Sequence, residues 1–243
     1  MQKLSINTTL NYSPNFDQNK RKPKEIKFLI LHYTGMKKEK DAINKLTNEK
    51  SKVSCHYFIK NNGEILTLVP DLYTAWHAGI SSWQNFKFLN KNSIGIEISN
   101  PGHENFYKRF PKKQINSILN LILFLIKKYK IKKNFILGHS DIAPERKKDP
   151  GEKFPWEILA NKKIGIWHMT NQNFLKKIRL RKVSKHEESE FYKTLFKIGY
   201  FPEAKSKFDK KMIINSFQRH FRQKLVNGKI DQECLFIAKK LVK

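Results

Sequence analysis

The sequence predicts an α/β protein, with a mixed central sheet flanked by helices and a small all-helical C-terminal domain. Short apolar runs rich in β-branched residues alternate with amphipathic helical periods up to about residue 161. From about residue 173 only helical periods remain. We therefore divide the 243 residues into an N-terminal arm (1–24), a first domain (25–172) and a helical domain (173–243).

Strands are expected at five places in the first domain. Residues 26–32 form a continuous apolar run, typical of a strand buried on both faces. Residues 53–60 and 64–69 flank Asn61-Asn62-Gly63, a sequence that favours a hairpin turn. In residues 93–99 the isoleucines alternate strictly with polar or small residues, which predicts one apolar face. A last short strand is expected at residues 134–137.

Helices are expected between and after these strands. Residues 39–50 have a short amphipathic period, and residues 114–130 carry a long apolar stripe on one side. Apolar residues at helical spacing around 191–196, 212–217 and 235–241 predict three helices in the C-terminal domain. We expect the preceding part of the chain, up to position 172, to fold without these helices, because it contains apolar strands of its own.

The net charge is strongly positive. The chain has 49 Lys and Arg against 21 Asp and Glu, which gives +28 and predicts attraction to polyanions. The lysines are spread along the whole chain, and no helix-turn-helix, zinc-finger or RNA-binding signature accompanies them. We therefore expect no specific nucleic-acid partner, and a nucleic-acid-binding function is an alternative that rests on charge alone.

The cysteines and the hydropathy of the sequence bear on disulfide content, membrane insertion and cellular location. Cys55 and Cys234 lie far apart and form no disulfide framework. The longest apolar stretch, residues 118–126, is too short to span a bilayer. The N-terminal arm is polar and carries no export signal, so we expect a cytoplasmic monomer; a periplasmic or wall-associated location stays open.

Three residues near strand ends suggest a metal site. His32 closes the first strand, His139 follows the last one, and Asp149 lies ten residues further on. Two imidazoles and one carboxylate suit a zinc site with a fourth position left for water, whose pKa the metal would lower to about 7. The alternative is that each histidine is a hydrogen-bonded structural residue, and the spacing alone does not decide.

Glu97 is unusual because it lies inside an isoleucine-rich strand. An unpaired buried carboxylate would cost several kcal/mol. Beside a metal-bound water, however, the same carboxylate can accept a proton and pass it to a leaving amine. The alternative is a half-exposed strand whose polar face meets solvent.

Together these segments resemble the zinc N-acetylmuramoyl-L-alanine amidases of the type-2 family, which are related to peptidoglycan-recognition proteins. The resemblance covers roughly residues 24–160. It rests on five motifs in order: His32-Tyr33-Thr34, Ser54-Cys55-His56-Tyr57, Trp76-His77-Ala78-Gly79, residues 93–98, and residues 138–144 continuing through Lys147, Asp149, Pro150 and Gly151.

The resemblance implies a role for each matching residue. His32, His139 and Asp149 match the Zn²⁺ ligands of the family. Glu97 matches the catalytic carboxylate, and Lys147 matches the lysine that stabilises the oxyanion. Trp76 and His77 match residues that line the substrate cleft. For His77, a role as a packing residue is an equally good interpretation. We interpret His56 and Tyr57 as structural.

The C-terminal segment resembles the three-helix peptidoglycan-binding module of some bacterial amidases, through residues 198–200 and 214–222. The expected function is hydrolysis of the amide between N-acetylmuramic acid and L-alanine in peptidoglycan or muropeptides, in cell-wall turnover or recycling. The alternative is a non-catalytic peptidoglycan-binding protein of the same fold. Intact His32, His139, Asp149, Glu97 and Lys147 favour the enzyme.

Overall fold

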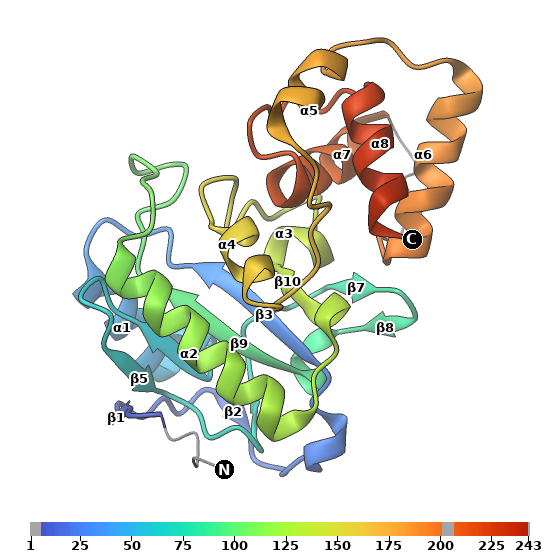
Figure 1. The fold of residues 1–243 in the computed structure, drawn as a ribbon. Coiled ribbons are helices and arrows are strands. Elements are labelled where there is room, and N and C mark those ends of the chain that lie inside the picture. Colours follow the sequence, from blue (N-terminus) through green and yellow to red (C-terminus); the bar gives the residue numbers. More distant parts are fainter. Residues whose placement is uncertain (1–5, 201–206, 243) are drawn as a thin grey trace.

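A six-stranded mixed sheet forms the centre of the computed structural model, which describes residues 6–200 and 207–242 (Figure 1). In spatial order the strands are β1 (Thr9–Leu10), β5 (Ile65–Thr67), β4 (Tyr57–Ile59), β9 (Ser93–Ile98), β3 (Phe28–Tyr33) and β10 (Ile136–Gly138). Neighbouring strands are parallel except β4 and β5, which form the predicted hairpin. The predicted fold class is confirmed.

Strand β3 lies near the middle of the sheet and is buried on both faces, as its continuous apolar run predicts. Phe28 and Ile30 point to one face, and Leu29 and Leu31 point to the other; all four are fully buried. The next residue on the face of Phe28 and Ile30 is His32. The alternation of the strand therefore places a histidine at its carboxyl end, on the same face as Phe28 and Ile30.

One face of the sheet is covered by α2 (Lys112–Tyr129), which runs across the strands in Figure 1. Its apolar stripe packs against Leu29, Leu31 and the alternating isoleucines of β9. The buried residues of this stripe are Ile118, Leu121, Ile122 and Leu125. The strict alternation predicted for β9 is confirmed, because its isoleucines face α2 and Gly95 and Glu97 face the opposite side.

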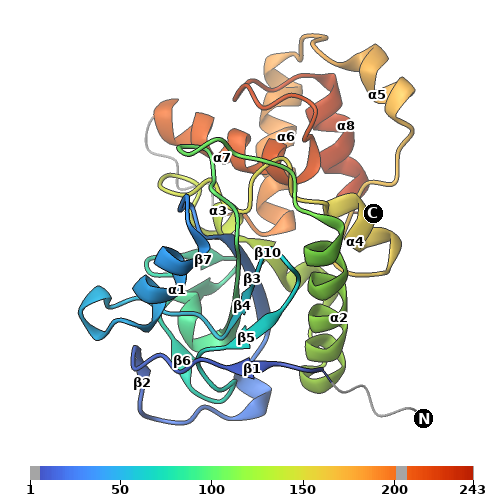
Figure 2. The same ribbon diagram turned by 90° about the vertical axis from the view of Figure 1, so that its left-hand side faces the viewer.

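The other face is covered in two parts. Helix α1 (Glu39–Thr47) packs over β4 and β5 through a small apolar cluster. The C-terminal helices share a buried apolar cluster with β3 and β10, and the turned view of Figure 2 shows them gathered at one end of the sheet. They are α5 (Gln172–Ile178), α6 (Lys185–Ile198), α7 (Lys207–Phe221) and α8 (Gln232–Leu241). The three predicted helices are α6, α7 and α8, and the short α5 precedes them.

The sheet and the C-terminal helices share one hydrophobic cluster. Phe28 and Ile30 of β3 and Leu137 of β10 belong to the same buried cluster as Phe191 of α6 and Phe217 of α7. Ser184 caps the N-terminus of α6, because its hydroxyl accepts a hydrogen bond from the backbone N–H of residue 187, and Gly199 caps the other end. The C-terminal helices therefore share a hydrophobic core with the strands that carry the candidate site, and α7 contacts α3 beside those strands.

The N-terminal arm is attached to the domain at several points. Besides β1, it contributes β2 (Phe16–Asp17), which pairs with β6 (Thr74–Ala75). The buried Ser13 hydroxyl donates to the carbonyl of Leu46 at 2.6 Å, and the Asn15 side chain donates to the carbonyl of Asn48 at 2.8 Å. These are long-range contacts that local sequence patterns do not encode.

The remaining elements are short. A hairpin joins β7 (Ser82–Trp83) to β8 (Phe86–Lys87), and short helical turns form α3 (His139–Ile142) and α4 (Trp156–Asn161). The 3₁₀ helices are Pro23–Glu25, Glu49–Ser51, Leu89–Asn92 and Lys133–Phe135. Both cysteines are free and buried. Among the described residues, no helix is long and apolar enough to cross a membrane.

Candidate metal centre and active site

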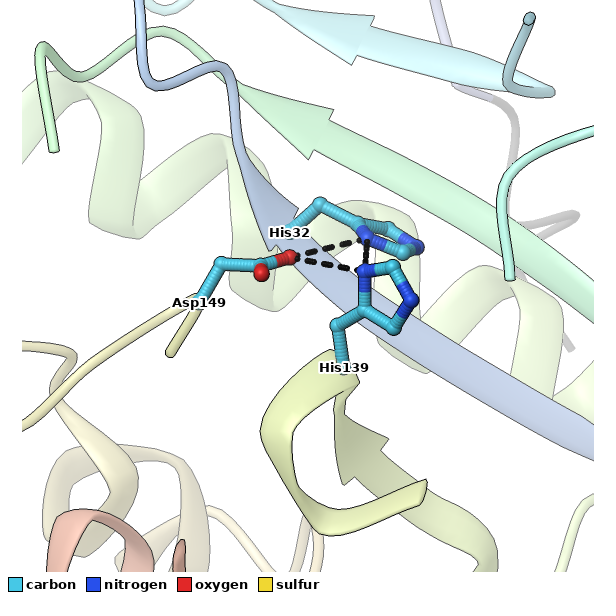
Figure 3. Close-up of side chains that lie close together, drawn as sticks. All are labelled: His32, His139 and Asp149. Atoms are coloured by element: carbon cyan, nitrogen blue, oxygen red, sulfur yellow. Dashed lines mark hydrogen bonds and ion pairs between the residues drawn. The ribbon is translucent and has the colours of Figure 1, made fainter. Parts of the chain in front are cut away.

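Three side chains converge at the carboxyl ends of the parallel strands (Figure 3). The Nδ1 atoms of His32 and His139 lie 2.9 Å apart. The Oδ2 atom of Asp149 is 3.0 Å from the Nδ1 of His32 and 3.1 Å from that of His139. All three side chains are buried. The structure therefore brings together the three residues that the sequence analysis assigned as metal ligands.

Each of these residues is placed by a different element. His32 lies on β3, and His139 is the first residue of α3, directly after β10. Asp149 comes from the following loop, where its carbonyl accepts a hydrogen bond from the backbone N–H of Ser140 at 2.9 Å. This backbone bond fixes the loop against α3. Polar residues beyond the carboxyl ends of parallel strands are the usual location of a site in α/β folds.

The hydrogen bonds of the two imidazoles determine which nitrogen faces the centre. His139 Nε2 lies 3.2 Å from the carbonyl oxygen of Ala78, which can only accept, so this nitrogen carries the proton. His32 Nε2 lies 3.1 Å from Nδ1 of His77. The Nδ1 atoms of His32 and His139 are then left with lone pairs that point toward Asp149.

The contact between His77 and His32 is part of a chain of hydrogen bonds that all run in the same direction. The Ser93 hydroxyl donates to the carbonyl of Leu89 at 2.6 Å, so its oxygen is free to accept from His77 Nε2 at 3.1 Å. His77 Nδ1 then accepts from His32 Nε2. The chain therefore fixes the tautomer of His32, which is the common role of groups behind a metal-ligating histidine.

The converging lone pairs fit a bound cation. Two imidazole Nδ1 atoms and a carboxylate oxygen lie within about 3 Å of one another, and this arrangement would be repulsive for neutral, ligating imidazoles unless a positive charge sat among them. Burial lowers the pKa of His32 to about 4, so its neutral, ligating form is the one present at pH 7. The donor set, nitrogen and oxygen in a small buried group, suits zinc.

Glu97 lies beside this centre on β9. It is half-buried, and its Oε2 atom is buried with no hydrogen-bond partner among the described residues. Burial raises the pKa of this carboxyl to about 8, and the charge of Asp149 adds to the effect. A bound cation beside this carboxyl would lower its pKa and favour the carboxylate, and a group whose pKa lies near neutrality can both accept and donate a proton. Lys147 is also half-buried, and its positive charge opposes the effects of burial and of Asp149 by lowering the pKa of Glu97.

A cleft of about 320 Å³ opens over the centre. All seven predicted site residues line it: His32, Trp76, His77, Glu97, His139, Lys147 and Asp149. Trp76 is held at the wall by a hydrogen bond from its indole N–H to Asp17, at 2.8 Å. His56 and Tyr57 lie elsewhere, buried below the cleft, where the hydroxyl of Tyr57 donates to Asp71. The positions of His56 and Tyr57 agree with the structural interpretation.

Other residues of the site were not found from the sequence. Tyr33 and His103 line the cleft, where the tyrosine hydroxyl lies 2.8 Å from His103 Nδ1, and His103 Nε2 lies 2.9 Å from Glu152. Tyr33 directly follows the ligand His32, which was a usable signal. The pairing of residues 103 and 152 depends on two loops far apart in sequence, and no local pattern predicts it.

An α/β fold with two histidines and an aspartate at its strand ends, beside an unpaired glutamate, has the residues that a hydrolase site able to hold a metal ion requires. Residues 22–152 match the family described as N-acetylmuramoyl-L-alanine amidase. The N-acetylmuramoyl-L-alanine amidase AmiD of Escherichia coli is 35% identical over 232 residues, which cover 89% of this chain and 82% of that protein. The 1,6-anhydro-N-acetylmuramyl-L-alanine amidase AmpD of Haemophilus influenzae is 34% identical over 163 residues, covering 60% and 86% of the two chains.

Solved structures give the same result. The E. coli AmiD complex with anhydro-N-acetylmuramic acid-L-Ala-D-gamma-Glu-L-Lys has a TM-score of 0.79 at 34% identity, and covers 90% of this chain and 89% of that one. The structure of AMPDH3 from Pseudomonas aeruginosa also has a TM-score of 0.79, at 28% identity, and covers 94% and 95%. This chain therefore belongs to the N-acetylmuramoyl-L-alanine amidase family, and it is an amide hydrolase.

Proposed function

We propose that this enzyme uses zinc to hydrolyse the amide between N-acetylmuramic acid and L-alanine in muropeptides. The observation that carries the proposal is the convergence of two Nδ1 lone pairs and the Asp149 carboxylate beside an unpaired Glu97. The substrates bound in the two relatives support the choice of substrate class: AmiD holds an anhydro-N-acetylmuramyl peptide, and AMPDH3 holds an anhydromuramic pentapeptide.

His32, His139 and Asp149 would hold the zinc ion. When bound, zinc supplies a Lewis acid for the amide carbonyl and lowers the pKa of a coordinated water. The chain contributes the fixed direction of the ligands, because Ala78 and His77 hold the two imidazoles from behind.

Glu97 is proposed to move the proton that the reaction requires. As a water oxygen forms a bond to the carbonyl carbon, the Glu97 carboxylate accepts one of the water protons. When the C–N bond breaks, Glu97 donates that proton to the leaving nitrogen, which departs as the free amine of L-alanine. The other product is the carboxylic acid of the muramic acid lactyl group, which keeps the second water proton until it ionises and releases that proton to solvent. Lys147, on the wall of the same cleft, would stabilise the negative charge that develops on the carbonyl oxygen.

Trp76 and His77 are proposed to shape the cleft in different ways. The Trp76 side chain lines the wall and is fixed by Asp17, which makes it a rigid apolar surface for the substrate. His77 lines the cleft too, but its ring nitrogens are engaged by His32 and Ser93. We assign His77 the positioning of His32 as its main role.

Mass spectrometry of the products tests the proposal. Purified protein is incubated with zinc and either anhydro-muropeptides or intact sacculi, and Glu97→Gln serves as the matched control. We expect release of peptides with a free L-alanine amino group from the wild type, and release that is slower on the order of 10²- to 10⁴-fold from the variant. Cleavage of a different bond would overturn the assignment. Zinc binding without any cleavage of either substrate would instead support the non-catalytic peptidoglycan-binding alternative.

The cellular location expected from the sequence, the cytoplasm, remains a proposal. It is tested by fractionating cells that produce the full-length protein and blotting each fraction. Recovery in the periplasm or wall fraction would contradict it. The two substrates of the mass-spectrometric experiment bear on the same question, because intact sacculi are met only outside the cytoplasm.

A further inference from the structure

The carboxylate of Asp141 joins the metal centre to the C-terminal helices. Asp141 lies in α3, two residues after His139, and its Oδ2 accepts a hydrogen bond from the backbone N–H of Gly138 at 2.7 Å. The same carboxylate is held by two side chains from beyond residue 172. The hydroxyl of Tyr200 lies 2.5 Å from Oδ1, and Nδ1 of His220 lies 2.7 Å from Oδ2.

A third hydrogen bond joins α3 to the C-terminal helical part of the chain. The hydroxyl of Ser216 donates to the carbonyl of Ser140 at 2.6 Å, in the residue directly after His139. Helices α3 and α7 lie side by side in both views (Figures 1 and 2). Asp141, Tyr200, Ser216 and His220 are all buried, so their hydrogen bonds are shielded from water and difficult to replace.

The two donors to Asp141 are themselves rigidly held. The ring of His220 stacks on Trp156 with a centroid distance of 3.8 Å and an angle of 19°. Tyr200 packs edge-on against Trp83 at 4.9 Å. The residue before Tyr200 is Gly199, where an added Cβ would lie 2.4 Å from Trp83, so the chain approaches this indole as closely as it can. Donors fixed in this way impose a position on the carboxylate they contact.

The position of Asp141 matters because α3 is only one turn long. A helix this short does not hold its own geometry in isolation. Its first residue is His139, whose Nδ1 must stay near both His32 and Asp149. The bond from Ser140 N–H to the Asp149 carbonyl links the same turn to the third ligand. A shift of α3 therefore displaces two of the three ligands together.

We propose that Tyr200 and His220 are positioning residues of the metal centre, acting through Asp141. The inference rests on the proposed function, in which His139 and Asp149 hold zinc. It gives the C-terminal helices a role in the affinity for metal, which is separate from any role in binding the cell wall. Groups behind metal ligands are typically worth roughly 10- to 100-fold in metal affinity or activity.

The test measures zinc affinity by competition with a chelator in full-length protein. The variants are Tyr200→Phe, which removes one donor, and His220→Leu, which removes the other. His220→Asn restores an N–H close to the position of Nδ1. Tyr192→Phe removes a hydroxyl from α6 of the same helical domain, at a half-buried tyrosine, and serves as the matched control. Thermal unfolding of each metal-free variant reports the general loss of stability.

We expect Tyr200→Phe and His220→Leu to bind zinc roughly 10- to 100-fold more weakly. Tyr192→Phe should match the wild type, and His220→Asn should recover most of the loss caused by His220→Leu. Wild-type zinc affinity in the folded Tyr200→Phe and His220→Leu variants would overturn the proposal. An equal loss of zinc affinity in His220→Asn and His220→Leu would also overturn it, because the loss would then come from the missing ring contacts and not from the missing N–H donor.

The outcome also separates this inference from the proposed function. If the wild type binds no zinc, or if His139→Ala binds it as tightly as the wild type, the ligand assignment is wrong and both proposals fail. If the wild type binds zinc through His139 and the Asp141 donors have no effect on affinity, only the positioning role fails.

Discussion

His32 and Glu97 are register partners on the adjacent parallel strands β3 and β9. Because registered residues of neighbouring strands point to the same face, the proposed metal ligand and the proposed proton-transferring carboxylate are placed beside each other by the sheet itself. Their relative position depends on the strand pairing and on no loop. The most demanding pair of the proposed mechanism is therefore carried by the most rigid part of the fold.

The ligand assignment is tested by His139→Ala. The variant removes one of three ligand atoms, so we expect loss of stoichiometric zinc and of amidase activity together. Metal content by elemental analysis and product release by mass spectrometry measure the two effects. His186→Ala, at an exposed histidine of α6, is the control and should change neither. Full activity in His139→Ala, or in chelator-treated wild type, would rule the assignment out.

The role of Glu97 is tested by Glu97→Gln, which keeps the shape of the side chain and removes its charge. Zinc should stay bound, because the carboxylate is not among the converging ligand atoms. We expect kcat to fall on the order of 10²- to 10⁴-fold, the usual contribution of a positioned acid or base. If the variant loses its metal instead, Glu97 is a ligand and the role of Asp149 has to be revised.

Much of this site was predictable because it depends on local patterns. Continuous apolar runs and strict alternation place His32 and Glu97 on strands, and those patterns are direct consequences of burial. All seven predicted residues line the cleft, but Trp76, His77 and Lys147 were assigned through motifs that resemble the amidase family and not through periodicity. The pairing of the N-terminal arm with β5 and the hydrogen bonds from Tyr200 and His220 to Asp141 were not predicted. They join segments that lie far apart in the sequence, and no periodicity records such contacts.

The pH dependence of stability gives a separate test of the environment of Glu97. Burial raises its pKa from 4.5 to about 8 in the folded, metal-free protein. Between these values the folded state holds a proton that the unfolded state has lost, so wild-type stability falls as pH rises through this window. Glu97→Gln mimics the protonated acid and lacks this loss.

The difference in melting temperature between Glu97→Gln and wild type, both free of metal, should therefore be small near pH 4.5 and grow in favour of the variant up to about pH 8. Differential scanning calorimetry across this range measures it. A constant difference at every pH would show that Glu97 has an ordinary pKa, and would place its carboxylate in contact with solvent.

Gly95→Ala tests the support behind His32. Gly95 lies under the ring of His77, and an added Cβ would stand 2.4 Å from its Cγ atom. The ring has to move, and it would then lose its contact with His32 Nε2. We expect a destabilisation of about 1–3 kcal/mol, typical of overpacking, together with weaker zinc binding. Chemical denaturation and chelator competition measure the two effects, and unchanged zinc affinity would show that His77 does not position the ligand.

Removal of the C-terminal helices gives the last prediction. The apolar strands before position 173 predict a part that folds and binds metal without them. The shared cluster gives a reason to expect less, because truncation after position 172 removes Phe191, Phe217 and the other helical members of the buried cluster to which Phe28 and Ile30 belong. A large apolar side chain contributes about 1.5–3 kcal/mol when fully buried. We therefore expect a much lower melting temperature and weaker zinc binding in the truncated chain.

The truncation also tests whether the C-terminal helices are needed throughout the enzyme family or only in this chain. The AmpD protein of H. influenzae matches over 60% of this chain and 86% of its own length, so most of its length corresponds to little more than half of this chain. We would then expect α5–α8 to be required only in chains whose C-terminal helical part contacts Asp141 and shares an apolar cluster with β3. Adding the separate fragment 173–243 should restore part of the zinc affinity if it docks on the exposed face. A truncated chain with wild-type melting temperature and zinc affinity would show that the part before the helices is self-sufficient, and that the contacts to Asp141 add nothing to the metal centre.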